Sequence, residues 1–169
     1  MTGIAGLVFG LAVSGWAHGP GEHGRVEKKD TAREAAFLEV EGTLSRYRAA
    51  FEARSTEKLA EVVDKDLLVL EGTAKNVGWA DYRDSHIGPE MKEWESLSYA
   101  DPVAVDWQIE GDLGWAAVQS TVTIVSGGKP MTIDAAETFV LRRSAGRWLI
   151  RHIHWSGKRR PESKPPEAK

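Results

Sequence analysis

Four segments with alternating apolar and polar residues fill the second half of this 169-residue chain, between Tyr99 and Gly157. Three pairs of turn-forming residues separate them, at Gly111-Asp112, Gly127-Gly128 and Ala145-Gly146. Each pair can form a two-residue hairpin loop, so the four segments are predicted to be strands of an antiparallel meander. This meander constrains the fold most strongly, because the rest of the chain must cover its apolar face.

The register of the meander follows from counting outward from the three turns. Counting predicts that Ala116 lies opposite both Trp107 and Phe139, and that Glu137 and His154 are neighbours on the same face. This face is otherwise almost entirely apolar. Its predicted members are Val103, Val105, Trp107, Ile109, Gly114, Ala116, Val118, Val122, Ile124, Ile133, Glu137, Phe139, Leu141, Trp148, Ile150, His152 and His154.

The opposite face is mostly polar, but the last strand places Leu149, Ile153 and Trp155 there. An exposed apolar strip of this kind is usually buried by a partner. The sequence therefore predicts a homodimer through this face, with coverage by the Pro-rich C-terminal tail as the alternative.

Helical periodicity dominates the first half of the chain. Thr31 and Glu34 have the spacing of a capping box, which predicts that a helix starts there. Ser55 can cap a second, shorter helix, Leu67–Leu70 is predicted to be a buried strand, and Gly78–Glu95 is predicted to form short helices. The apolar stripe of the first helix consists of Phe37, Val40, Leu44, Tyr47 and Phe51. These patterns predict an α+β domain with N-terminal helices packed on a curved, four- to five-stranded antiparallel sheet.

Both ends of the chain differ in composition from its middle. Residues 1–17 contain no charged side chain and include an apolar run too short to span a bilayer, which predicts a signal peptide and a periplasmic or secreted protein. No stable membrane insertion is expected after cleavage. The run lacks a preceding Lys or Arg, so a loosely packed N-terminal segment is the alternative. Residues 18–30 are predicted to be a flexible linker, 31–157 the folded domain, and 158–169 a disordered tail rich in Pro and charge.

Charge and cysteine content narrow the classes of partner. The formal net charge is −3 and the pI is about 6.0. Nucleic acid is therefore not expected as a partner, because its binding needs Lys and Arg side chains clustered on one face. The chain has no cysteine, which excludes disulfides, thiolate nucleophiles and thiolate metal ligands.

Two stretches carry a resemblance to a known family: Gly78–Tyr82 running on to His86–Glu90, and above all Gly146–Ser156. With the order of a long helix, short helices and a four-strand meander, they resemble the nuclear-transport-factor-like superfamily, including its SnoaL-like members. The resemblance covers most of residues 31–157. It implies a cone-shaped, cystatin-like roll with its ligand or active site between the helices and the concave sheet face, in a chain that is often a homodimer. It does not imply a reaction, because the superfamily spans isomerases, dehydratases, hydroxylase subunits and plain binding or assembly domains.

Glu137 and His154 are the first candidate site residues. A buried carboxylate is costly unless it is paired, and His154 is its predicted neighbour. Glu137 could accept a proton next to a carbonyl group while His154 orients it, as general base catalysis requires. A polar pair that merely orders the sheet is the competing interpretation. His152, one row away, is predicted to hydrogen-bond either a ligand or a backbone carbonyl.

Five further residues are predicted to line the pocket. Trp79, Tyr82 and His86 fall on the short helices near the mouth of the cone, and Trp107 and Phe139 fall on the inner face of the sheet. Aromatic packing in the core is the competing interpretation for Trp79 and Tyr82.

No cofactor is expected. Glu137 and the three histidines of the folded domain could surround a metal, but none has the local spacing typical of a metal site. Cleavage after Ala17 would expose His18 near His23 as candidate copper ligands, again without a folded third ligand.

Three functions remain open at this stage. The leading hypothesis is an exported domain that binds a small, partly apolar molecule, with Glu137, His152 and His154 as the polar groups of an aromatic pocket. The first alternative is a cofactor-independent isomerase or dehydratase that uses Glu137 or His154 as a general base. The second alternative is a dimeric assembly domain without a ligand, whose interior is filled by its own rings.

Overall fold

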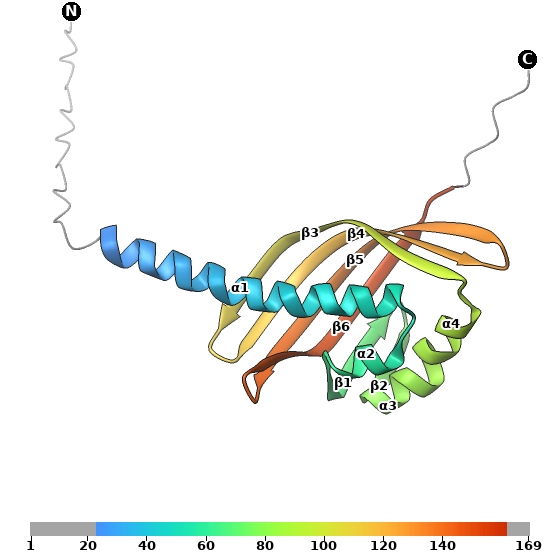
Figure 1. Cartoon of the computed structure of the whole chain (residues 1–169), viewed down its shortest axis with the longest axis horizontal. Coiled ribbons are helices and arrows are strands. Elements are labelled where there is room, and N and C mark those ends of the chain that lie inside the picture. The colour runs from blue at the N-terminus through green and yellow to red at the C-terminus, as the bar shows by residue number, and fades with distance from the viewer. Residues whose placement is uncertain (1–22, 162–169) are drawn as a thin grey trace, which may run out of the picture.

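The computed structural model describes residues 23–161 and shows one long helix lying across a strongly curved sheet (Figure 1). The helical elements are α1 (His23–Glu52), α2 (Thr56–Ala60), α3 (Trp79–Tyr82), the π-helical turn η1 (Arg83–Ile87) and α4 (Gly88–Glu93). The strands are β1 (Val63–Glu71), β2 (Ala74–Val77), β3 (Ser96–Glu110), β4 (Leu113–Ser126), β5 (Lys129–Ser144) and β6 (Arg147–Arg159). The predicted α+β class is confirmed.

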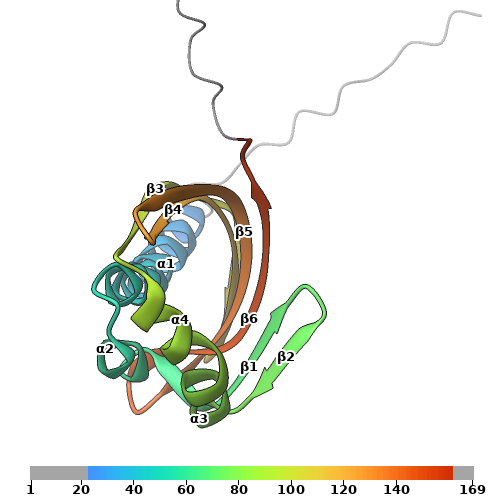
Figure 2. The same ribbon diagram turned by 90° about the vertical axis from the view of Figure 1, so that its right-hand side faces the viewer.

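All six strands form one sheet in the order β2-β1-β6-β5-β4-β3. β1 runs parallel to β6, and every other neighbouring pair is antiparallel. The sheet therefore has six strands, where four to five were predicted. β2 was missed because its four residues, Ala74–Val77, include Lys and Asn and show no run of alternating apolar residues. Figure 2 shows the β1–β2 hairpin at one edge of the sheet, next to α3.

The three predicted two-residue turns are confirmed. In each hairpin the residues that flank the loop pair directly with each other. These closing pairs are Glu110–Leu113, Ser126–Lys129 and Ser144–Arg147. Ala116 lies opposite Trp107 on one side and Phe139 on the other, as predicted.

A β-bulge in the last strand changes which side chains of β6 point inward. Leu141 pairs with Ile150, but the next residue of β5, Val140, pairs with His152. Arg151 is therefore an extra residue in β6. Because side chains alternate along a strand, one extra residue exchanges the two faces beyond that point.

The bulge makes the predicted register of β6 wrong. Glu137 lies opposite Trp155 instead of beside His154, and His154 is exposed on the outer face. Ile153, expected on the outer face, is 1% exposed and belongs to the core. Of the strip predicted to bury itself in a homodimer, Leu149 alone keeps its outward position.

Two further irregularities occur in β3. Breaks in its register fall between Ala100 and Val103 and between Ala104 and Asp106. Residues without a partner on β4 shift the alternation of side chains, as in β6. Val103 and Val105 are consequently 57% and 59% exposed, and their predicted inward orientation is wrong.

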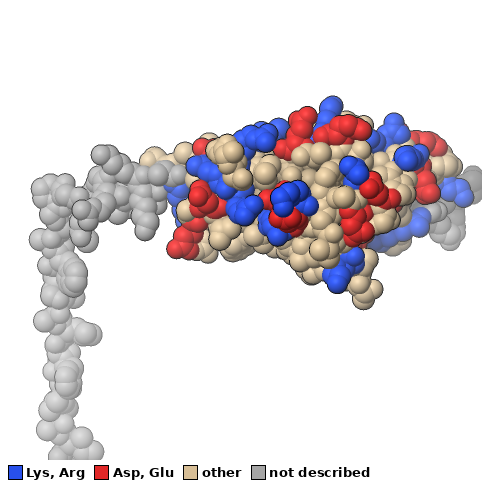
Figure 3. Space-filling view, turned by 90° about the horizontal axis from the view of Figure 1, so that it is seen from below, with Lys and Arg blue, Asp and Glu red and all other residues tan. Residues whose placement is uncertain are grey.

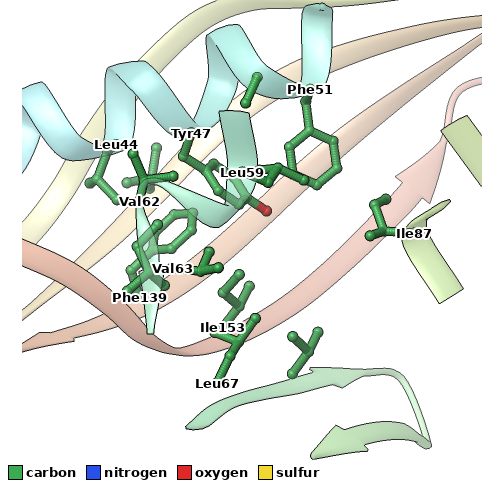
Figure 4. Close-up of a cluster of buried hydrophobic side chains, with 14 of the residues drawn as sticks. Leu44, Tyr47, Phe51, Leu59, Val62, Val63, Leu67, Ile87, Phe139 and Ile153 are labelled. Atoms are coloured by element: carbon green, nitrogen blue, oxygen red, sulfur yellow. The ribbon is translucent and has the colours of Figure 1, made fainter. Parts of the chain in front are cut away.

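The core lies between α1 and the concave face of the sheet (Figure 4). Tyr47 points from α1 toward the sheet, where its ring meets that of Phe139 edge-on at a centroid distance of 5.2 Å. The predicted stripe on α1 is confirmed, since Val40, Leu44, Tyr47 and Phe51 are all buried. The predicted helix start is wrong, because α1 begins at His23, before the capping box at Thr31.

Outside the core, Figure 3 shows Lys and Arg side chains interspersed with Asp and Glu on the face it presents. Within residues 23–161, no helix is both long and apolar enough to cross a membrane. Three predicted segments lie outside the described residues: the signal peptide, residues 18–22 of the linker and residues 162–169 of the tail. β6 itself extends to Arg159, into the first residues of that predicted tail.

Candidate functional site

A cavity of about 320 Å³ opens between α1, the short helices and the concave face of the sheet. Its size is at the lower end of the range for small-molecule sites. Figure 4 shows side chains from three sides of this region, with Phe51 on α1, Ile87 on the short helices and Ile153 on the sheet. The lining residues are Tyr47, Phe51, Val69, Glu71, Tyr82, Ile87, Glu90, Glu93, Trp94, Leu97, Tyr99, Val122, Ile124, Met131, Ile133, Ile153 and Trp155.

Aromatic rings form much of the cavity wall. The Phe51 ring lies 4.7 Å from that of Tyr47 and 6.4 Å from those of both Trp94 and Tyr99, measured between centroids. The Phe51 and Trp94 planes are nearly parallel, at 29°, while Tyr99 is perpendicular to Phe51. Rings from a helix, a loop and a strand thus surround one apolar space.

The mouth of the cavity is acidic. Glu71, Glu90 and Glu93 line it, and the side chains of Glu71 and Glu90 are 38% and 46% exposed. His86 Nε2 lies 3.3 Å from Glu71 Oε2 and 3.4 Å from Glu90 Oε1. Burial raises the pKa of Glu90 above its usual range; His86 opposes this shift, and the neighbouring carboxylates of Glu71 and Glu93 reinforce it.

The short helices position His86 through a close backbone approach. The chain passes from α3 through η1 into α4 without a break. A Cβ at Gly88 would lie 2.3 Å from the carbonyl oxygen of Arg83, so only glycine fits this π-helical turn. The turn places His86 and Glu90 one helical turn apart, facing the same opening.

Asn76 of β2 fixes the orientation of the imidazole. His86 Nδ1 lies 2.7 Å from Asn76 Oδ1, and the Asn76 amide nitrogen donates to both Asp81 Oδ2 and Ser85 Oγ at 3.1 Å. Asn76 is itself buried. Such a network leaves His86 Nε2 directed at the two carboxylates of the mouth.

Glu137 lies behind the cavity wall on the inner face of the sheet. It is 3% exposed, and burial raises its pKa to about 7, against the opposing effects of the Arg48 charge and a hydrogen bond from Tyr47. Its Oε1 atom has no hydrogen-bond partner among the described residues. Tyr47 and Trp155, which flank Glu137, both line the cavity. A buried acid that is half-neutral near pH 7 therefore lies directly behind two wall residues.

Three tyrosines of the wall are neutral hydroxyls at physiological pH. Burial raises the pKa of Tyr47, Tyr82 and Tyr99 well above the usual value, and nearby carboxylates raise it further. Each can therefore donate a hydrogen bond to a ligand or to a carboxylate.

The structure brings two of the predicted site residues to the cavity, while Glu137 lies behind its wall. Tyr82 lines it, and His86 stands at its mouth with its ring edge-on to that of Tyr82 at 5.2 Å. Trp79 packs beside Tyr82 at 6.3 Å but does not line the space.

The other predicted site residues lie elsewhere. Phe139 is buried in the core, and Trp107 stacks on Phe37 at 4.3 Å, away from the cavity wall. The bulge turns both histidines of β6 outward: His152 Nδ1 lies 3.1 Å from the backbone oxygen of Leu68, and His154 is exposed. Neither histidine lies beside Glu137, so the predicted Glu137–His154 pair is wrong.

Sequence reasoning missed most of the acidic mouth. His86, Glu90, Glu93 and Trp94 follow at helical spacing and share one face, a pattern that could have identified them together. Trp155 was predicted on the wrong face because the bulge leaves no trace in the period-two pattern. Over residues 23–161, no group of three or more His, Asp or Glu side chains is arranged to hold a metal ion.

The comparisons with known proteins agree with this architecture. The model of the SnoaL-like domain family matches residues 40–158. None of the curated proteins matches the sequence. A nuclear transport factor 2 (NTF2-like) superfamily protein from Salmonella enterica serovar Typhimurium superposes with a TM-score of 0.64 and 16% identity, over 78% of this chain and 96% of that one.

Two further solved structures carry enzyme names. A candidate ketosteroid isomerase from Shewanella frigidimarina has a TM-score of 0.60 and 24% identity, over 68% of this chain and 92% of that one. A candidate scytalone dehydratase from Novosphingobium aromaticivorans has a TM-score of 0.69 and 10% identity, over 77% and 88%. At these identities the likeness shows the fold alone. The match over residues 40–158 shows that the chain belongs to the SnoaL-like domain family.

Proposed function

We propose that this protein binds a small, partly apolar molecule in the cavity between α1 and the sheet. The observation that carries the proposal is the cavity itself: about 320 Å³ of space that the surrounding aromatic side chains leave unfilled. An assembly domain without a ligand gains nothing from such a void, because unfilled space in a core lowers stability. The apolar run from Ile4 to Val13 supports export of the chain as part of the same proposal.

A cavity-filling substitution tests this proposal. Val122 is 4% exposed and lines the cavity from β4, so Val122→Trp should fill the space and abolish binding of a neutral aromatic probe such as 2-phenylethanol. Gln119→Trp is the matched control, because Gln119 lies on the exposed side of the same strand. Calorimetric titration measures both, with Val122→Phe in reserve if the larger ring prevents folding.

Equal binding of the probe to Val122→Trp and to the unmodified protein would mean that the cavity is not the site. Failure of the unmodified protein to bind any aromatic probe of this size would refute the proposed function altogether.

Proton-transfer catalysis of the isomerase or dehydratase type is the second candidate, favoured by Glu137. Its Oε1 atom lacks a partner and its pKa of about 7 suits a general acid or base at neutral pH. It ranks second because Tyr47 and Trp155 stand between Glu137 and the cavity. Under this alternative Glu137→Gln abolishes turnover yet leaves ligand affinity nearly unchanged, whereas a protein that only binds shows no turnover to lose.

A further inference from the structure

The charged groups that line the cavity all carry the same sign. Three carboxylates, those of Glu71, Glu90 and Glu93, stand at the mouth, and no Lys or Arg lines the space. His86 is shared between Glu71 and Glu90, so the mouth stays negative even when the imidazole is protonated. Arg48, which acts on Glu137 from behind the wall, is itself paired with Glu41.

The rings behind this mouth present π-electron surface to the same space. Six aromatic residues line it. Phe51 and Trp94 stand with nearly parallel planes and centroids 6.4 Å apart, and Tyr99 meets Phe51 at a right angle. Aromatic faces attract cations within about 6 Å, with Trp the strongest. The six lining rings are Tyr47, Phe51, Tyr82, Trp94, Tyr99 and Trp155.

A further acid lies directly behind the cavity wall, outside the space itself. Glu137 Oε1 is buried without a partner, next to the Tyr47 hydroxyl and across from Trp155. Tyr47 and Trp155 separate it from the space, so it acts on a ligand only through its charge, which favours a positive ligand over a negative one. An anionic ligand would be repelled by the three carboxylates at the mouth.

From the rings and the acidic mouth together, we infer that the ligand of this cavity is an organic cation: an amine or quaternary ammonium compound with an apolar or aromatic body. This inference rests on the proposed binding function and narrows it to one class of ligand.

Three probes of similar size and different charge test the inference by calorimetric titration at pH 7.5. 2-Phenylethylamine carries a positive charge, 2-phenylethanol is neutral and 3-phenylpropanoate is negative. The amine should bind roughly tenfold more tightly than the alcohol, and the carboxylate should bind most weakly. The preference for the amine should shrink as ionic strength rises, because its charge interacts with exposed carboxylates.

Substitutions locate the interaction. The double variant Glu71→Gln/Glu90→Gln should reduce amine affinity while leaving alcohol affinity unchanged, and Glu110→Gln, at the exposed far end of β3, is the control. Trp94→Leu should weaken amine binding as well. If this variant folds poorly, benzyltrimethylammonium, which has no N–H donor, serves as the probe of ring contact in the unmodified protein. It should still bind more tightly than the alcohol.

The outcomes separate the two proposals. If the alcohol binds as tightly as the amine, or the carboxylate binds best, the cavity remains a binding site and the organic-cation inference is overturned. If the amine binds but the glutamate variants do not change its affinity, it binds elsewhere and the inference is overturned as well. If none of the three probes binds, the proposed function fails together with the inference.

Discussion

Glu137→Gln should stabilise this protein, and the gain should depend on pH. Glu137 is almost fully buried and its pKa is raised from 4.5 to about 7 by burial. A raised pKa means that folding favours the protonated form of Glu137. The stability that this form contributes is fully present below about pH 4.5 and is lost as pH rises through about 7. At about 1.4 kcal/mol per pH unit, the difference between the folded and unfolded pKa values sets the loss of stability on ionisation of Glu137. This loss is about 3 kcal/mol at pH 8.5 and less than about 1 kcal/mol at pH 5.

Urea denaturation of both proteins at pH 5 and pH 8.5 measures this effect. Glutamine cannot ionise, so the free energy of unfolding of Glu137→Gln should exceed that of the unmodified protein by about 2 to 3 kcal/mol more at pH 8.5 than at pH 5. Comparing the same pair at two pH values cancels any constant effect of losing the Tyr47 contact. Glu110→Gln, at an exposed position, should show no such change. If the two proteins differ in free energy of unfolding by the same amount at pH 5 and pH 8.5, Glu137 is not a buried acid with a raised pKa.

Further substitutions test the packing around the site. Gly88→Ala should destabilise the protein by about 1 to 3 kcal/mol in thermal denaturation, because its Cβ would lie 2.3 Å from the Arg83 oxygen. Gly42→Ala is the control: its Cβ would meet only the Arg46 side chain at 3.7 Å, so it should stabilise α1 by about 0.5 to 1 kcal/mol. Equal effects of the two substitutions would contradict the close approach at Gly88. Leu44→Ala should cost about 2 to 5 kcal/mol in the free energy of unfolding, because Leu44 is fully buried beneath α1; a loss below about 1 kcal/mol would show that the helix packs less closely on the sheet. Asn76→Ala should release His86 and change the NMR chemical shifts of its ring, since Asn76 Oδ1 contacts Nδ1 at 2.7 Å; unchanged shifts would mean that the contact does not form in solution.

Much of the fold was predictable because its determinants are local. The three turns follow from two-residue loops in which glycine or alanine adopts positive φ, including Ala145 at 49°, and the turn dipeptides identify them without tertiary information. The stripe from Val40 to Phe51 repeats at the helical period. Ser55 caps α2 by accepting a hydrogen bond from the Lys58 N–H at 3.2 Å, as its position before a helical segment predicted.

The candidate site was less predictable because it depends on one inserted residue. Arg151 in β6 carries no sign of a bulge, yet it exchanges the faces of His152, Ile153, His154 and Trp155. A register counted from a turn is correct only up to the first irregularity. Glu137 was found because β5 is regular from its turn through that position.

The acidic mouth needed tertiary information of another kind. Glu71 at the end of β1 meets His86 and Glu90 only because the β1–β2 hairpin stands beside the short helices. Nothing in the spacing between Glu71 and His86 indicates that contact. The helical spacing of His86, Glu90 and Glu93 was readable, but it becomes informative only once the cavity behind it is known.

A crystal structure of the protein grown with saturating 2-phenylethylamine tests most directly whether the space under α1 is a ligand site. The expected result is the ligand ring in the cavity against the side chains of Phe51 and Trp94, with its ammonium group within about 4 Å of a mouth carboxylate. Side chains that have collapsed into the cavity, with the ligand absent or bound on the outer face of the sheet, would contradict it.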